Sequence, residues 1–112
     1  MGLLFWKKNA EIDAFAKTLS DDLFSRIQPV AMQLYFGFAV DGQKPLTPQK
    51  TKEVQQRLQD MLMQVRQFKQ LNKLGIYGKA RLHMIFRERL TELGFAPEVV
   101  QKLDRLVLLQ TP

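Results

Sequence analysis

The sequence predicts a mainly helical α+β domain, with about four helices and a short two-stranded β-hairpin around residues 30–47. Apolar residues recur at three- and four-residue steps in several segments, which is typical of amphipathic helices. One eleven-residue segment instead alternates large apolar residues with others, which is typical of a strand. The chain has 112 residues, of which 46% are hydrophobic and 25% charged. This is the composition of a folded protein, and we expect a single domain over residues 1–112.

The first helix is predicted over residues 9–27. Asn9 is a plausible N-cap, and acidic residues follow it where the helix dipole favours anions. Gln28 precedes a proline and is therefore pushed out of the helical region, which ends the helix. The apolar face has these members: Ile12, Phe15, Ala16, Leu19, Leu23 and Ile27.

The hairpin is predicted from residues 30–40 and the turn that follows them. The large apolar residues of this segment occupy alternate positions: Val30, Met32, Leu34, Phe36, Phe38 and Val40. Asp41-Gly42 is a dipeptide that favours a tight hairpin turn. The return strand contains Pro45, which cannot donate a ladder hydrogen bond and belongs on an edge. A buried helix from Pro29 to Val40 is the alternative, and it would make the protein an all-α bundle.

The second helix is predicted over residues 48–73, with Thr47 as its cap and Pro48 at its first position. Its apolar residues step by four and three: Val54, Leu58, Met61, Val65 and Phe68, with Asn72 next. This heptad seam is typical of a helix that packs inside its own domain or also meets a second copy.

Two further helices are predicted over residues 79–93 and 97–110. Gly94 followed by Phe95, which can reach back toward Leu90, indicates a Schellman stop for the first of them. Pro97 is suited to open the second. The tail "RLVLLQTP" is apolar enough to end as a strand instead.

Composition excludes several classes of site. The chain has no cysteine and one histidine. Disulfides, thiol chemistry and standard structural zinc sites are therefore excluded, and we expect neither a metal nor a cofactor.

The start of the chain, "MGLLFWKK", combines a short apolar run with two cations. No stretch approaches the roughly 18 apolar residues of a membrane span, and the cations follow the apolar run, contrary to the order in a secretory signal. We expect a cytoplasmic protein without stable membrane insertion. Residues 3–6 could pack onto the bundle, pair with 30–40 as a strand, or dip into an anionic interface beside Trp6 and the lysines.

Catalysis has little support in the sequence, and we expect a non-enzymatic protein. His83 lies at the margin of its helix's apolar arc, with Arg87 one turn further on. A catalytic histidine usually has an orienting carboxylate, so we interpret His83 as structural. Asp21 and Asp22 are adjacent and point about 100° apart on a helix, so they form neither a dyad nor a metal clamp.

The net charge of +6 is unevenly distributed. Residues 44–89 contain eleven lysines and arginines and three acidic residues, whereas the rest of the chain is mildly acidic. Such asymmetry suggests attraction to nucleic acid, anionic lipid or an acidic protein. The candidate surface for DNA or RNA consists of Arg66, Lys69, Lys73, Lys79, Arg81 and Arg87.

The glycines between the helices predicted over residues 48–73 and 79–93 can be compared with phosphate-binding motifs. Gly78-Lys79 lacks the earlier glycine and the following Ser or Thr of a P-loop. Gly75-Ile76-Tyr77-Gly78 resembles the G-x-x-G loop of KH domains, and this resemblance implies binding of RNA backbone. The chain departs from that family at Ile76 and Tyr77, where basic or small residues are preferred. It departs again at Arg81, where an apolar residue is expected.

A partner surface is suggested by Arg89, which falls inside the apolar arc of its helix. A lone buried arginine is costly, so it should be paired, with Glu92 as the candidate partner, or snorkel to solvent, or lie at an interface. Arg89, Phe68 and Asn72 are therefore candidate interface residues. The leading hypothesis is a cytoplasmic protein-interaction or self-associating module with an unknown protein partner or a homodimer. The alternative is a nucleic-acid-binding protein that uses the basic surface of residues 66–87.

Overall fold

The protein is an all-α bundle in the part of the chain that the structure describes. A computed structural model describes the backbone of residues 2–109 and the side chains of residues 7–109. The helices are α1 (Gly2–Arg26), α2 (Pro29–Tyr35), α3 (Pro48–Asn72), α4 (Ile76–Glu92) and α5 (Pro97–Leu109). Residues 2–109 contain no strand. The predicted β-hairpin is therefore wrong, and the alternative of an all-α fold is confirmed.

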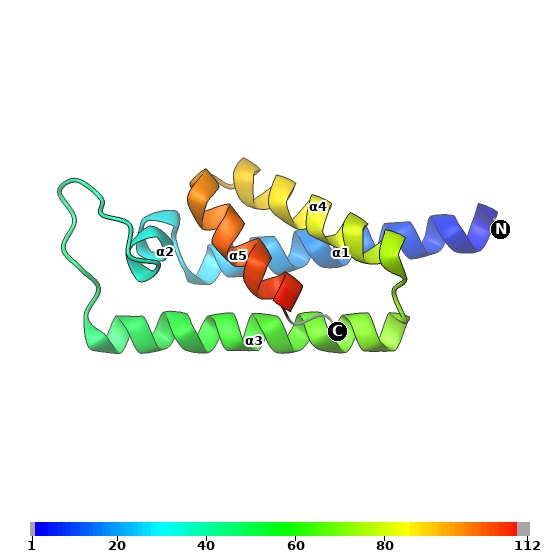
Figure 1. Cartoon of the computed structure of the whole chain (residues 1–112), viewed down its shortest axis with the longest axis horizontal. Coiled ribbons are helices and arrows are strands. Elements are labelled where there is room, and N and C mark those ends of the chain that lie inside the picture. Colours follow the sequence, from blue (N-terminus) through cyan, green and yellow to red (C-terminus); the bar gives the residue numbers. More distant parts are fainter. Residues whose placement is uncertain (1, 110–112) are drawn as a thin grey trace.

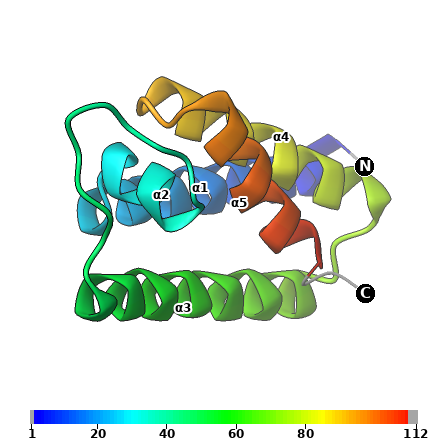
Figure 2. The ribbon, with the colours of Figure 1, turned by 60° about the vertical axis from the view of Figure 1, so that its left-hand side comes forward.

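The bundle is elongated, with extents of 53 × 23 × 21 Å. Helices α1 and α4 lie side by side and run in the same direction, while α3 runs the opposite way below them (Figure 1). Helix α5 crosses from the end of α4 toward the end of α3 (Figures 1 and 2). The start of α1 and the turn between α3 and α4 lie at the same end of the molecule, opposite α2 (Figure 1).

Helix α1 begins earlier than predicted. It starts at Gly2, and Asn9 is an interior position and not an N-cap. No proline or other helix breaker separates residues 2 and 9, so a local capping preference does not stop the helix. Its end is as expected, because Gln28 before Pro29 has an extended backbone with ψ of 155°.

The segment predicted as a hairpin forms α2 and a connecting loop. Pro29 occupies the first turn of α2, and Met32 is fully buried. Met32 and Phe36 are spaced four apart, so the same apolar residues that alternate along a strand also line one face of a helix. The Asp41-Gly42 turn does form, since the backbone N–H of Gln43 donates to the carbonyl of Val40 at 3.1 Å. A turn dipeptide sets only local geometry and does not supply a partner strand.

Helix α3 has the predicted start. The side-chain oxygen of Thr47 accepts a hydrogen bond from the N–H of Lys50 at 3.1 Å, and Pro48 occupies the first position. The seam packs within the domain, because four of its apolar members are buried: Val54, Leu58, Met61 and Val65.

Helix α4 starts at Ile76, three residues before the predicted start, with Gly75 as its N-cap. It ends as predicted. Gly94 has φ of +98°, and the N–H of Phe95 donates to the carbonyl of Leu90 at 3.1 Å, which is the Schellman pattern. Pro97 then opens α5, which remains helical to Leu109, the last described residue.

The core lies between α1, α4 and α5, and α3 covers it from one side. The largest fully buried apolar side chains come from every helix: Phe86, Ile12, Ile27, Met32, Leu82, Leu90, Leu103, Val54, Val65, Val99 and Val107. Burial of such residues is the main favourable term in folding. The end of the bundle where α3 turns into α4 has a different kind of surface.

Candidate interaction surface

The turn between α3 and α4 depends on a lysine and not on a glycine. Lys73 has φ of 47° and ψ of 54°, a left-handed conformation, and its N–H donates to the carbonyl of Lys69. Gly75 has φ of −80° and ψ of −173°, an extended conformation open to any residue. The predicted G-x-x-G loop is thus mostly the first turn of α4. KH domains contain a β-sheet, whereas residues 2–109 of this chain contain no strand. The resemblance therefore does not extend to the fold.

Gly78 has a packing role. A Cβ at this position would lie 3.3 Å from Leu74 Cδ2 and 3.4 Å from Ile12 Cδ1. The first turn of α4 therefore approaches α1 closely. The ammonium of Lys8 also donates to the backbone carbonyl of Asn72. These contacts hold the beginning of α1 beside the α3–α4 turn.

Three large apolar or aromatic residues around this turn are exposed, and Tyr77 among them also hydrogen-bonds with Arg81. Ile76 is 91% exposed, Leu71 is 83% exposed and Tyr77 is 56% exposed. Sequence reasoning did not identify this cluster. Two features of the sequence could have indicated that these residues are exposed. Leu71 lies outside the heptad seam of α3, and Ile76 and Tyr77 lie at the beginning of the next helix.

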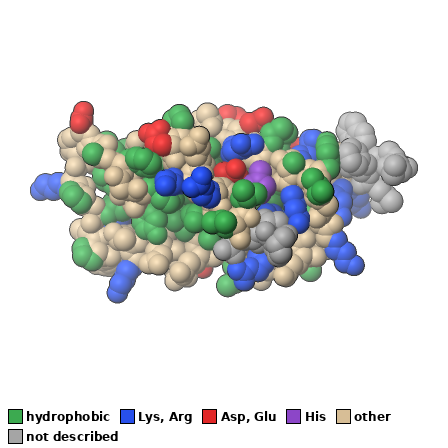
Figure 3. All heavy atoms as spheres, viewed as in Figure 1, with side chains coloured by type: hydrophobic (Ala, Val, Ile, Leu, Met, Phe, Trp, Pro, Cys, Tyr) green, Lys and Arg blue, Asp and Glu red, His purple; other side chains and the backbone are tan. Residues whose placement is uncertain are grey.

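Cations surround these apolar side chains. Residues 61–87 contain no acidic residue. Lys and Arg side chains lie around the end of the molecule where α1 begins and α3 turns into α4 (Figure 3). We call the following residues the basic apolar end: Leu71, Lys73, Ile76, Tyr77 and Lys79, with Lys7 and Lys8 of α1.

The six cations predicted as a nucleic-acid surface do not form one solvated face. Arg81 donates two hydrogen bonds to the carboxylate of Asp13, at 2.7 and 2.8 Å. The Nε atom of Arg87 lies 3.7 Å from the Oδ2 atom of Asp104. Arg66 is exposed on α3 and Lys73 is exposed in the turn after it, whereas Lys79 is half-buried and Lys69 is buried. The structure therefore uses several of these charges to connect its own helices.

Lys69 contacts the end of α5 from α3. Its side chain is 7% exposed, and its Nζ lies 3.5 Å from the carbonyl oxygen of Val107 in the last turn of that helix. Carbonyls in a last turn lack intrahelical partners and carry a partial negative charge, so a cation there is favourable. Burial, with a smaller effect from Lys79, lowers the pKa of Lys69 to about 8, although Asp104 opposes the shift.

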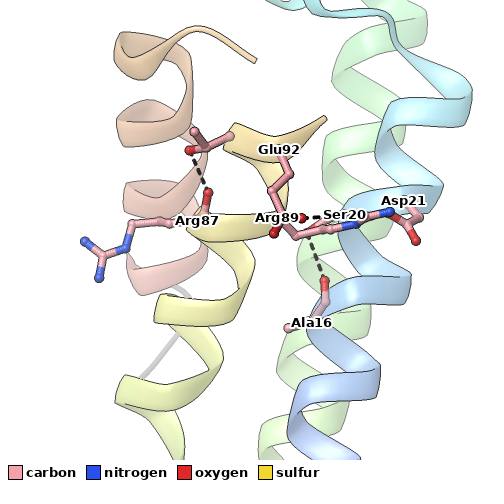
Figure 4. A network of polar contacts seen from close by, with 7 residues as sticks. Ala16, Ser20, Asp21, Arg87, Arg89 and Glu92 are labelled. Carbon is pink, nitrogen blue, oxygen red and sulfur yellow. Dashed lines mark hydrogen bonds and ion pairs between the residues drawn. The ribbon is translucent and has the colours of Figure 1, made fainter. Parts of the chain in front are cut away.

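The three predicted interface residues make contacts within the chain. Arg89 reaches from α4 to α1, where its Nε donates to Asp21 at 2.7 Å, and it also contacts Glu92 at 3.5 Å (Figure 4). The expected pairing with Glu92 is confirmed. Phe68 stacks on Phe15 with ring centroids 4.0 Å apart, and the Asn72 amide donates to the Phe68 carbonyl at 2.9 Å.

His83 is buried, and it has a carboxylate partner that the sequence did not indicate. Its Nδ1 lies 2.6 Å from Asp104 Oδ1, which α5 supplies from 21 residues further along the chain. The other ring nitrogen, Nε2, is buried without a hydrogen-bond partner. The pair therefore joins α4 to α5, and its second ring nitrogen is enclosed by the fold.

The described side chains contain no cluster of three or more His, Asp or Glu residues that could hold a metal ion. Among the described helices, none has both the length and the apolar composition that a bilayer crossing requires. Comparisons with models of protein families, with curated proteins and with solved structures find no match for this chain.

Proposed function

We propose that this protein is a small, non-enzymatic cytoplasmic module that binds a negatively charged partner through its basic apolar end. The observation that carries the proposal is the exposure of Ile76, Leu71 and Tyr77 beside lysines, in a stretch of sequence, residues 61–87, without acidic residues. Apolar side chains of this size are usually covered in a monomer, and clusters of them mark interaction sites. The surrounding lysines favour an acidic partner by charge complementarity.

The other features that suggested a partner have explanations within the fold. The seam of α3 is buried in a single copy of the chain, and Arg89 is paired with Asp21. Self-association through the seam therefore has less support than docking through the basic apolar end. The buried His83–Asp104 pair offers no accessible acid–base group, which supports a binding role over a catalytic one.

Heparin, a soluble polyanion, tests whether the basic apolar end is the binding surface. A triple variant, Lys7→Gln with Lys73→Gln and Lys79→Gln, removes three of its charges. A control removes three lysines that are exposed elsewhere: Lys44→Gln, Lys52→Gln and Lys102→Gln. We expect the test variant to elute from a heparin column at much lower salt than the control. Equal loss of retention in both variants would mean that net charge alone is responsible and would refute the proposal.

Nucleic acid is the second candidate partner. The observation in its favour is the polar outer face of α3, where Arg66 is exposed among glutamines such as Gln67 and Gln70, with Lys73 exposed in the turn that follows. Contacts to phosphate make affinity fall steeply with salt. A mobility-shift assay with DNA and RNA at two salt concentrations tests this candidate, and the absence of a shift at low salt would exclude it.

A further inference from the structure

The shape of the basic apolar end restricts the kind of partner that fits it. Ile76 is 91% exposed and Leu71 is 83% exposed, so these side chains stand out from the surface and do not line a groove. A folded protein would need a matching pocket for each of them. Single-stranded nucleic acid is bound through stacking of its bases on aromatic side chains and through cations that contact its backbone, and aliphatic side chains supply neither. A fluid bilayer interface accepts protruding aliphatic groups without a preformed pocket.

The beginning of α1 extends this surface. Its ribbon projects past the α3–α4 turn (Figure 1), and the Lys8 contact with the Asn72 carbonyl holds the two segments together. The sequence of this helical segment, Leu3-Leu4-Phe5-Trp6-Lys7-Lys8, combines apolar residues, a tryptophan and two lysines. Tryptophan, tyrosine and lysine are the residues that concentrate at the level of lipid headgroups.

The charge of this end matches an anionic surface. Lys7, Lys8 and Lys73 are exposed, and Lys79 is half-buried in the first turn of α4. Glu11 is the nearest exposed acid on α1, about one turn beyond Lys8. Each lysine close to an anionic leaflet adds to the attraction, and the apolar side chains add a term that salt does not screen.

We infer that the basic apolar end docks onto the surface of a membrane containing anionic lipid, with Ile76 and Leu71 entering the interface and the lysines contacting the headgroups. This inference rests on the proposed function and names the partner for it. The binding is peripheral, because two or three apolar side chains and a helix start give reversible attachment and not insertion.

Sedimentation with lipid vesicles tests the inference. Vesicles contain either phosphatidylcholine alone or phosphatidylcholine with 30% phosphatidylglycerol. The variant Leu71→Ser with Ile76→Ser removes the exposed apolar groups, and the control Met63→Ser with Met84→Ser changes two exposed methionines away from this end. Since all four side chains are exposed, we expect both variants to fold, and circular dichroism checks this.

We expect the unmodified chain and the methionine control to bind the anionic vesicles and not the neutral ones. We expect the Leu71/Ile76 variant to lose about tenfold or more in partition coefficient. Unchanged binding by that variant, or no binding of the unmodified chain to anionic vesicles, would overturn the inference. If the heparin experiment still identifies the basic apolar end, failure with vesicles leaves the proposed function standing with a different acidic partner. Failure on heparin refutes the proposed function itself.

Discussion

The guanidinium of Arg81 on α4 and the carboxylate of Asp13 on α1 form a two-point ion pair, with hydrogen bonds of 2.7 and 2.8 Å. The two residues lie 68 positions apart in the chain, at the interface of the two helices that pack most extensively. The hydrogen bond from Arg81 lowers the pKa of Asp13 below its ordinary value, against the opposing effect of burial.

This pair predicts an acid-sensitive contribution to stability. Because the pKa of Asp13 is lower in the folded state than in the unfolded state, the pair stabilises the protein above the ordinary aspartate pKa of about 3.8. The contribution is lost as pH falls through the lower, folded-state pKa. We expect Asp13→Asn to lower the urea midpoint at pH 7 and to have much less effect near pH 2. A loss of equal size at both pH values would contradict this account.

Lys69 predicts a second pH dependence of the same sign, in the alkaline range. Its folded pKa is about 8, against an ordinary value of 10.5, so the unfolded chain binds the extra proton between these values. Stability contributed by this site therefore rises as pH increases from about 8 to 10.5. We expect Lys69→Met to remove this rise in urea unfolding, measured relative to the unmodified protein. Lys73→Met, at an exposed position, is the control that should retain it.

Gly94 should be less replaceable than Gly75. Gly94 has φ of +98°, which a residue with a Cβ adopts at a cost, whereas Gly75 has an ordinary extended backbone with open space around its Cβ position. We expect Gly94→Ala to reduce the free energy of unfolding by about 1–2 kcal/mol. Gly75→Ala should cost less, about 0.5–1 kcal/mol, because alanine is a poorer N-cap than glycine but the backbone is not strained. Equal effects in urea titrations would mean that the Schellman stop does not depend on the glycine.

The seam of α3 should stabilise one copy of the chain and not a dimer. Leu58 is 4% exposed, so Leu58→Ala removes buried contacts and should cost about 2–5 kcal/mol. Leu71→Ala, on the exposed face of the same helix, should change stability by less than about 0.5 kcal/mol. The unfolding midpoint of the unmodified protein should be independent of protein concentration. A midpoint that rises with concentration would indicate that the seam also joins two copies.

The sequence by itself determined several helix boundaries, because their signals act over a few residues. Thr47 caps α3, Gly94 ends α4 and Pro97 opens α5, and each of these contacts joins residues at most five positions apart or needs one fixed dihedral angle. The faces of the long helices followed from the same local periodicity. The role of Gly78 was not foreseen, since its neighbour Ile12 lies far away in the chain.

Only the tertiary structure decided whether residues 30–47 form strands or a helix, and which charged side chains are used in ion pairs within the fold. Alternation of apolar residues suits either a strand or a buried helix, and the absence of a partner strand in residues 2–109 decided for α2 and a loop. In the sequence, Arg81 looks like a surface cation, and Arg89 is a cation inside an apolar arc whose main partner is not evident. Each finds its carboxylate 68 residues away, because packing of α4 on α1 brings opposite charges together at distances that no local pattern encodes. What remains exposed, the basic apolar end, is therefore a property of the fold.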